Sequence, residues 1–231
     1  MNRATTGRWA AEFVGTAFLV GAGTGAVVAA GRIGGVPGWA MASAWFFAVL
    51  TPIVLVIDVS GAHLNPAVTL ALASSRRFPW RDVPGYWLAQ FGGALCASLL
   101  VLATLGNGSH LGATLPANGD LLGAFAAEAV FTGLLVGSVF GIADRRPGGA
   151  GWRILLPPAV VGAATYLIGP WTGSSLNPAR TVAPAVMSGT YADLWLYLVA
   201  VPAGALTAAA LWRPREMKGA LPGYGTDRPA L

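Results

Sequence analysis

Long apolar runs separated by polar connections recur along the chain. A helix that crosses a bilayer needs about 20 mostly apolar residues, and six runs approach that length. The pattern therefore predicts an all-α membrane protein with six transmembrane helices, and no soluble domain. The six runs are residues 10–30, 39–57, 84–105, 121–143, 154–169 and 191–212.

Short motifs of the first half return in the second half. Residues 11–16 (Ala-Glu-Phe-Val-Gly-Thr) return as 127–132 (Ala-Glu-Ala-Val-Phe-Thr), and Leu-Asn-Pro-Ala occurs at both 64–67 and 176–179. Each half contains three spans, an odd number, so the halves cross the membrane in opposite directions and form an inverted repeat. We expect a single transmembrane channel domain over 1–231, with repeats at approximately 8–105 and 121–213.

Each Asn-Pro-Ala motif predicts a helix that begins inside the membrane. Asparagine is a strong N-cap, and proline is favoured at the first helical position, where a missing N–H costs nothing. The helices expected at about 66–74 and 178–187 cover only about half of a hydrocarbon core ~30 Å thick. In an inverted repeat, two such re-entrant half-helices enter from opposite faces and their positive N-terminal ends meet near the midplane. The meeting point contains Asn65, Pro66, Ala67, Asn177, Pro178 and Ala179.

Composition and charge agree with a membrane location. The chain is 55% hydrophobic and 10% charged, whereas soluble domains carry about 25% charged residues. A net charge of +5 could indicate nucleic-acid binding, but six spans place all basic residues except Arg32 and Arg180 on one side. The positive-inside rule assigns that side, with both termini, to the cytoplasm. The charge therefore needs no nucleic-acid partner, and the bias of thirteen arginines to one lysine favours a bacterial inner (plasma) membrane.

Few side chains could support chemistry. No carboxylate pair, metal cluster or nucleophile–base arrangement points to an enzyme, and with only His63 and His110 as histidines we expect no metal site and no cofactor. Cys96 is the only cysteine, so no internal disulfide can form, and its small neighbours predict that it is buried. Glu12 and Glu128 lie within spans, where ionisable groups are costly and indicate a special task.

These motifs resemble those of the aquaporins, or major intrinsic proteins, over nearly the whole chain. The resemblance rests on residues 11–16, 60–69 (Ser-Gly-Ala-His-Leu-Asn-Pro-Ala-Val-Thr), 86–90 and 177–180 (Asn-Pro-Ala-Arg). Residues 77–84 are similar to the plant nodulin-like intrinsic proteins and their bacterial relatives. The resemblance implies a homotetramer in the lipid bilayer with one pore per subunit. It also implies that the motif asparagines offer N–H donors to a solute at the midplane.

The resemblance further implies a selectivity filter at Trp45, Thr165, Ser174 and Arg180, located by family spacing from the motif asparagines. Water-selective members carry a histidine where this chain has Thr165, so a wider and less polar constriction is implied. Glycerol facilitators and many nodulin-like proteins also carry tryptophan at the position of Trp45. We therefore expect a passive channel for water and small uncharged solutes, such as glycerol or boric and arsenous acid. Protons and ions are excluded by the arginine and half-helix dipoles, the general account of aquaporin-type pores.

Other positions have less specific implications. Glutamates equivalent to Glu12 and Glu128 hold re-entrant loop backbone in the family, and His63 is expected to bond that backbone or to line the inner vestibule. Thr181 departs from the aspartate of glycerol facilitators, and Asp58 stands where many relatives have histidine, with no role assigned. Ser174 replaces the cysteine of some relatives, which predicts low sensitivity to mercurials.

Three alternatives stay open. A strictly water-selective aquaporin would pass water but neither glycerol nor boric acid. A secondary transporter shares inverted repeats and broken helices, but it would normally carry charged coupling sites where this chain has neutral amides. A purely structural, junction-forming role would show no flux at all.

Overall fold

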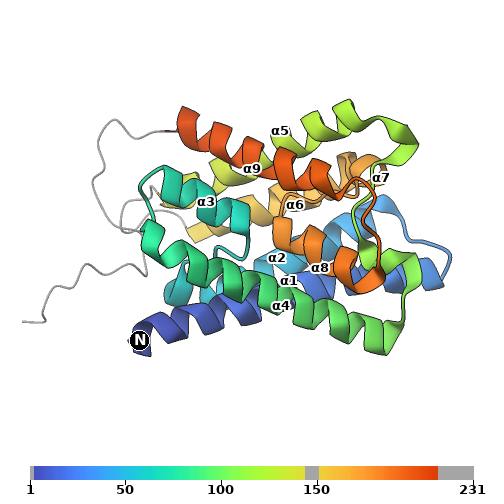
Figure 1. Cartoon of the computed structure of the whole chain (residues 1–231), viewed down its shortest axis with the longest axis horizontal. Coiled ribbons are helices and arrows are strands. Elements are labelled where there is room, and N and C mark those ends of the chain that lie inside the picture. Colours follow the sequence, from blue (N-terminus) through green and yellow to red (C-terminus); the bar gives the residue numbers. More distant parts are fainter. Residues whose placement is uncertain (1–2, 144–150, 213–231) are drawn as a thin grey trace, which may run out of the picture.

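The computed structural model describes residues 3–143 and 151–212. All regular structure in these ranges is helical, and the long helices run side by side in one bundle (Figure 1). Some basic residues used in the sidedness prediction lie outside the described residues. They are Arg145, Arg146, Arg213, Arg215, Lys218 and Arg228.

The first half contains three long helices and one short helix. Predicted spans 10–30, 39–57 and 84–105 lie within its long helices. The helices are α1 (Arg3–Arg32), α2 (Gly38–Ser60), α3 (Pro66–Ser74) and, after the 3-10 turn η1 (Trp80–Asp82), α4 (Val83–Leu105).

The second half repeats this order with one broken span. Two 3-10 turns, η2 (Gly108–Gly112) and η3 (Ala117–Gly119), connect the halves. The predicted spans 121–143 and 191–212 correspond to long helices. The helices are α5 (Leu121–Ala143), α6 (Leu156–Leu167), α7 (Gly169–Thr172), α8 (Pro178–Ser188) and α9 (Leu194–Leu211).

The predicted span 154–169 is not one continuous helix. In the described residues, five helices are long and apolar enough to cross a membrane, and α6 is too short to be one of them. The segment consists of the turn η4 (Gly151–Leu155), α6 and α7 in immediate succession. The break after α6 coincides with Gly169-Pro170, because Pro170 has no N–H to donate to the carbonyl of Tyr166 and the hydrogen-bond pattern of α6 cannot continue through it. The three pieces together extend from 151 to 172, which matches the length that a span requires.

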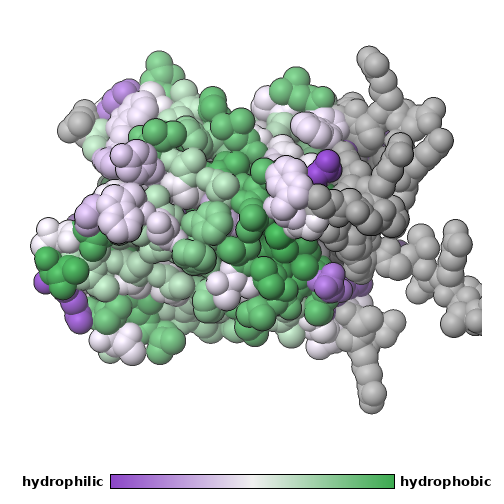
Figure 2. All heavy atoms as spheres, turned by 180° about the vertical axis from the view of Figure 1, so that it is seen from behind, coloured by the Kyte–Doolittle hydropathy of each residue, from purple (hydrophilic) through white to green (hydrophobic). Residues whose placement is uncertain are grey.

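The exterior of the bundle is apolar. Figure 2 shows hydrophobic residues over much of the middle of one face, with strongly hydrophilic residues toward its ends. Leu55, Leu88 and Leu122 are exposed by 70%, 75% and 81%. A soluble monomer rarely exposes apolar patches of this extent, so the surface suits lipid or a neighbouring subunit.

Cys96 lies on this exterior, so the prediction that it is buried was wrong. Its neighbours Gly93 and Ala97 are buried on one stripe of α4, while Leu99 and Leu100 are exposed. Residues three and four apart share a helix face, and Cys96 belongs with Leu99 and Leu100. Small neighbours in sequence did not reveal which face the thiol occupies.

The same helix contacts occur in both halves. α1 packs against α2 and α4, and α5 packs correspondingly against α6 and α9. Both long crossings depend on a glycine: a Cβ on Gly93 would lie 2.2 Å from the carbonyl oxygen of Phe13, and one on Gly204 would lie 2.0 Å from that of Ala129. Small residues let helix backbones approach closely in lipid, and here each repeat uses the same contact.

The half-helices α3 and α8 lie among the long helices and come from opposite ends of the bundle (Figure 1). Each packs against a long helix of the other repeat, α3 against α9 and α8 against α4. The two repeats are thus interlocked, and the N-terminal ends of α3 and α8 meet in the interior.

Candidate transmembrane pore

The meeting point of α3 and α8 is built from two asparagine N-caps. The side-chain oxygen of Asn65 accepts a hydrogen bond from the N–H of Ala67 (2.9 Å), and that of Asn177 accepts from Ala179 (3.0 Å) and Arg180 (3.4 Å). Proline follows each cap at the first helical position. The helix starts predicted at these motifs are therefore present, at the predicted residues.

The two caps are also joined to each other's loops. Nδ2 of Asn65 donates to the carbonyl of Leu176 (2.8 Å), and Nδ2 of Asn177 donates to the carbonyl of Leu64 (2.9 Å). An amide nitrogen carries two hydrogens, so each asparagine has one further hydrogen to offer to a molecule beside it.

A cavity of about 90 Å³ borders both asparagines. It has room for several water molecules. Most of its wall is apolar, and none of the described residues that line it is acidic. Its polar side chains are His63, Asn65, Ser174, Ser175, Asn177 and Arg180.

The loops before the half-helices have left-handed backbone at equivalent positions. Ala62 and Leu64 have φ angles of 50° and 52°, and Ser174 and Leu176 have φ angles of 48° and 53°. L-residues other than glycine rarely adopt this conformation because of steric cost. The surrounding structure must therefore hold both loops in place.

Glu12 on α1 holds the first loop. Its Oε1 accepts hydrogen bonds from the hydroxyl of Ser60 (2.8 Å) and the N–H of His63 (2.9 Å), and its Oε2 accepts from the N–H of Leu64 (2.7 Å) and the amide of Gln90 (2.8 Å). Four donors from three parts of the chain thus converge on one buried carboxyl group.

Glu128 on α5 holds the second loop in the same way. Its Oε1 accepts from the hydroxyl of Thr172 (2.7 Å) and the N–H of Ser175 (2.8 Å), and its Oε2 accepts from the N–H of Leu176 (3.0 Å). Both glutamates are fully buried. They contact the re-entrant loop backbone, where the family resemblance placed them.

Two buried tyrosines complete the loop supports, and the sequence analysis did not assign them this task. Tyr86 donates its hydroxyl hydrogen to the carbonyl of Ser60 (2.7 Å), and Tyr197 donates to the carbonyl of Thr172 (2.6 Å). The repeat in the sequence could have identified this pair, because Tyr86 and Tyr197 are separated by 111 positions, close to the spacing of the Asn-Pro-Ala motifs.

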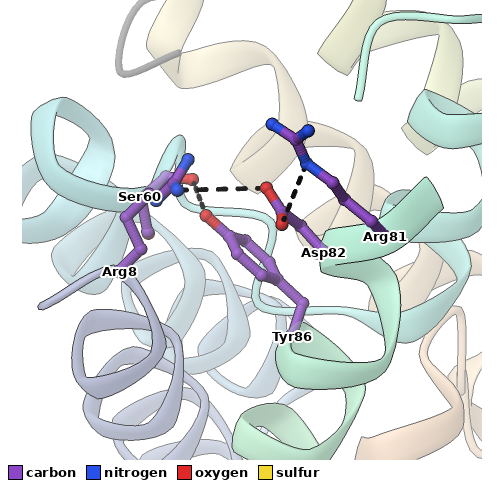
Figure 3. A network of polar contacts seen from close by, with 5 residues as sticks. All are labelled: Arg8, Ser60, Arg81, Asp82 and Tyr86. Atoms are coloured by element: carbon purple, nitrogen blue, oxygen red, sulfur yellow. Dashed lines mark hydrogen bonds and ion pairs between the residues drawn. The ribbon is translucent and has the colours of Figure 1, made fainter. Parts of the chain in front are cut away.

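Tyr86 also lies close to a surface ion-pair cluster. Figure 3 shows its hydroxyl directed at Ser60, with Asp82 nearby between Arg8 and Arg81. The carboxylate of Asp82 lies 3.9 Å from each guanidinium group. Pairs of this kind contribute little to stability, so the cluster is a minor contact between α1 and the turn η1 that precedes α4.

His63 lines the cavity with its ring against other aromatic side chains. Its Nδ1 lies 3.1 Å from the hydroxyl of Thr69. The ring centroids of Phe78 and Tyr86 lie 4.8 Å and 4.9 Å from that of His63. Its backbone N–H bonds Glu12, so this residue contributes both to the loop support and to the cavity wall.

Arg180 and Trp45 form one stacked unit at the cavity. Nη1 of Arg180 donates to the carbonyl of Gly112 (2.6 Å), and Nη2 donates to that of Gly173 (3.2 Å). The guanidinium carbon lies 4.5 Å from the centroid of the Trp45 ring, which is 4% exposed. Arginine stacks well on aromatic faces while its hydrogens bond acceptors in the plane.

The other two predicted filter residues have different positions. Ser174 lines the cavity, and its hydroxyl has no hydrogen-bond partner among the described residues; the same holds for Nε of Arg180. Thr165 is half-buried on α6, its hydroxyl donates to the carbonyl of Val161 (2.9 Å), and it is not among the lining residues. The structure thus brings together Trp45, Ser174 and Arg180, with Thr165 outside the lining.

Comparisons with known proteins agree with this architecture. The family model described as "Major intrinsic protein" matches residues 2–212. Aquaporin NIP1-1 of Oryza sativa subsp. japonica is 41% identical over 206 residues, with 86% of this chain and 70% of the relative covered. Nodulin-26 of Glycine max is 40% identical over 209 residues, with 86% and 74% covered. The X-ray structure of the aquaglyceroporin from Plasmodium falciparum superposes with a TM-score of 0.79 at 27% identity, and 91% of this chain and 96% of that chain are covered. The chain therefore belongs to the major intrinsic protein family, the aquaporins, and is a multi-pass membrane protein.

Proposed function

We propose that this protein is a passive channel for water and small uncharged solutes of the size of glycerol. The observation that carries the proposal is the crossed pair of amide hydrogen bonds, Asn65 to Leu176 and Asn177 to Leu64, at the wall of a largely apolar cavity. A strictly water-selective channel is not favoured, since the relatives are nodulin-like aquaporins and the solved neighbour is an aquaglyceroporin.

Proton and cation exclusion follows from the charges at the midplane. Two helix N-termini with positive partial charge converge there, and each asparagine adds a free N–H. A water molecule that accepts from both amides directs its own hydrogens away from the midplane, and this interrupts a proton-conducting chain of waters. A cation in the cavity is repelled by the positive N-terminal ends of α3 and α8 and by the Arg180 guanidinium. None of the described lining residues has a carboxylate that would compensate this repulsion.

Solute selection is proposed to take place where Trp45, Ser174 and Arg180 line the cavity, with Thr165 outside the lining. The indole offers an apolar face for carbon atoms, and Arg180 and Ser174 place polar side chains at the same cavity wall. Such a wall suits glycerol or a neutral hydroxylated acid such as boric or arsenous acid.

The remaining features are proposals supported by composition and by the family. We propose a homotetramer with one pore per subunit, in which residues 1–231 form one channel domain of two inverted repeats without enzymatic activity. The bias toward arginine and the distribution of basic residues support a bacterial plasma membrane location with cytoplasmic termini.

Stopped-flow light scattering on proteoliposomes tests the function directly, with protein-free liposomes as the control. We expect protein-dependent water efflux together with uptake of glycerol or boric acid, linear in solute concentration and independent of ion gradients. Fast water efflux without uptake of either solute would show a water-selective channel. Saturable, gradient-coupled uptake would show a transporter, and the absence of any flux would leave a structural role.

A further inference from the structure

Gly23 of α1 lies directly against the indole of Trp45. A Cβ at Gly23 would lie 2.4 Å from Cζ3, 2.5 Å from Cη2 and 2.7 Å from Cε3 of the tryptophan. Real Cβ atoms essentially never show contacts below 3.0 Å. All three atoms belong to the six-membered ring, so this ring occupies the space where a side chain at position 23 would stand.

The Trp45 indole also contacts Arg180 and borders the cavity. The guanidinium of Arg180 stacks on the indole ring and donates hydrogen bonds to the carbonyls of Gly112 and Gly173. Leu19 and Val49 belong to the same buried apolar cluster and line the cavity together with Trp45. The open space that the ring borders is the cavity.

The repeat shows that the fold itself does not require glycine at this place. Glu12, Thr16 and Gly21 on α1 correspond to Glu128, Thr132 and Gly137 on α5 at a constant spacing of 116 positions. The same spacing takes Gly23 to Val139, a branched residue that lines the cavity. Glycine inside a helix is also about 1 kcal/mol less favourable than alanine, so helix formation gives no reason for Gly23.

We propose that Gly23 is a positioning residue of the solute filter. Its missing side chain seats the Trp45 indole in the wall beneath Arg180 and thereby sets the width of the solute path. The proposal rests on the proposed function of this site. A methyl group at position 23 overlaps the ring and displaces it, and the open space beside the ring is the cavity.

The test compares two alanine substitutions on the same helix. Gly23→Ala meets the indole, whereas a Cβ at Gly25 would lie 3.8 Å from Val101 and 4.0 Å from Leu105, an ordinary contact distance. We expect Gly23→Ala to lower glycerol permeability relative to water permeability about fivefold or more, because overpacking forces neighbouring side chains from their preferred positions. Gly25→Ala should leave the ratio unchanged. The proposal would be overturned if the ratio of glycerol to water permeability were the same in wild type and Gly23→Ala. It would also be overturned if Gly25→Ala lowered this ratio as much as Gly23→Ala does.

A second pair of variants separates positioning from general damage. Phenylalanine has a single ring and reaches less far than the indole, so in a Trp45→Phe background Gly23→Ala should have little additional effect on the permeability ratio. The same fractional loss in both backgrounds would overturn the proposal. If Gly23→Ala alone fails to give folded protein, recovery of folded protein when Gly23→Ala is combined with Trp45→Phe supports the proposed contact between Gly23 and the indole. Failure of both the single and the double variant to fold contradicts it. If the wild-type protein passes water but no solute, the proposed solute function is wrong. The role of Gly23 is then decided by measuring the water permeability of the same variants.

Discussion

The side chain of Asn65 donates a hydrogen bond to the carbonyl of Leu176, 111 positions later in the chain and 2.8 Å away. The same amide caps α3 through its oxygen. One side chain therefore starts a half-helix, joins the two repeats and retains a hydrogen for the pore. Asn177 repeats this arrangement from the other side.

Loss of one asparagine should weaken both the fold and proton exclusion. Asn177→Ala removes a cap that serves two N–H groups and the bond to Leu64, and losing an N-cap costs about 0.5–2 kcal/mol. We expect a lower melting temperature and a measurable proton leak, followed with a pH-sensitive dye inside proteoliposomes. Asn107→Ala, which removes a long bond of 3.4 Å on an exposed loop, is the matched control. A dye trace identical to wild type would refute the assigned role of Asn177.

The two glutamates should be unequal in their contribution to stability. Glutamine in place of Glu12 or Glu128 turns an acceptor oxygen into an NH2 group that faces existing donors, and a buried polar group left unsatisfied costs about 1–3 kcal/mol. Glu12 receives four hydrogen bonds and Glu128 three. We therefore expect Glu12→Gln to lower the melting temperature of the purified protein more than Glu128→Gln. Equal melting temperatures for wild type and both variants would contradict the loop-support role.

Close helix crossings should not tolerate a methyl group. Gly204→Ala places a Cβ 2.0 Å from the backbone carbonyl of Ala129, which cannot move without displacing α5. We expect a loss of stability of about 1–3 kcal/mol or more, the usual effect of overpacking, seen as poor recovery and early thermal unfolding. A Cβ at Gly137 on α5 would meet no described neighbour within 4 Å, so Gly137→Ala should be neutral or stabilising by up to ~1 kcal/mol. A normal melting curve for Gly204→Ala would show that the helices can separate without cost.

Mercurial sensitivity should depend on position 174. Cys96 is exposed on the outside of α4 and is not a lining residue, so wild-type water flux should resist mercurials. Ser174 lines the cavity, and Ser174→Cys should give flux that mercurials block and thiols restore. Reversible block of the wild type would instead place a reactive thiol in or beside the solute path.

The sequence predicted the parts of the fold that local chemistry determines. Asn65-Pro66 and Asn177-Pro178 specify a cap followed by a first helical turn, so both half-helix starts could be placed to the residue. Apolar runs located the long helices, and the comparisons confirmed the aquaporin fold and family. The break in the fifth run depended on Gly169-Pro170, a local signal that the hydrophobic pattern concealed.

The contacts that shape the pore could not be predicted from single positions. Glu12 and Gln90 are 78 positions apart, and their pairing depends on how α1 packs against α4. The stack of Arg180 on Trp45 likewise joins α8 to α2. Helix orientation about its own axis decides such contacts, as it decided the exposure of Cys96. The proposed filter therefore stays a prediction that flux measurements must test.

The crossed amide bonds also govern how the chain can be made. Residues leave the ribosome at about 5–20 per second, so the partner of Asn65 is synthesised several seconds after Asn65 itself. During that interval the first re-entrant loop lacks the carbonyl of Leu176, and α3 lacks α9. The first three spans alone already contain the supports of this loop in Glu12 and Tyr86, but the amide of Asn65 and the carbonyl of Leu64 stay without their crossed partners. The midplane can therefore be completed only after residues 176 and 177 have been added to the chain, late in its synthesis.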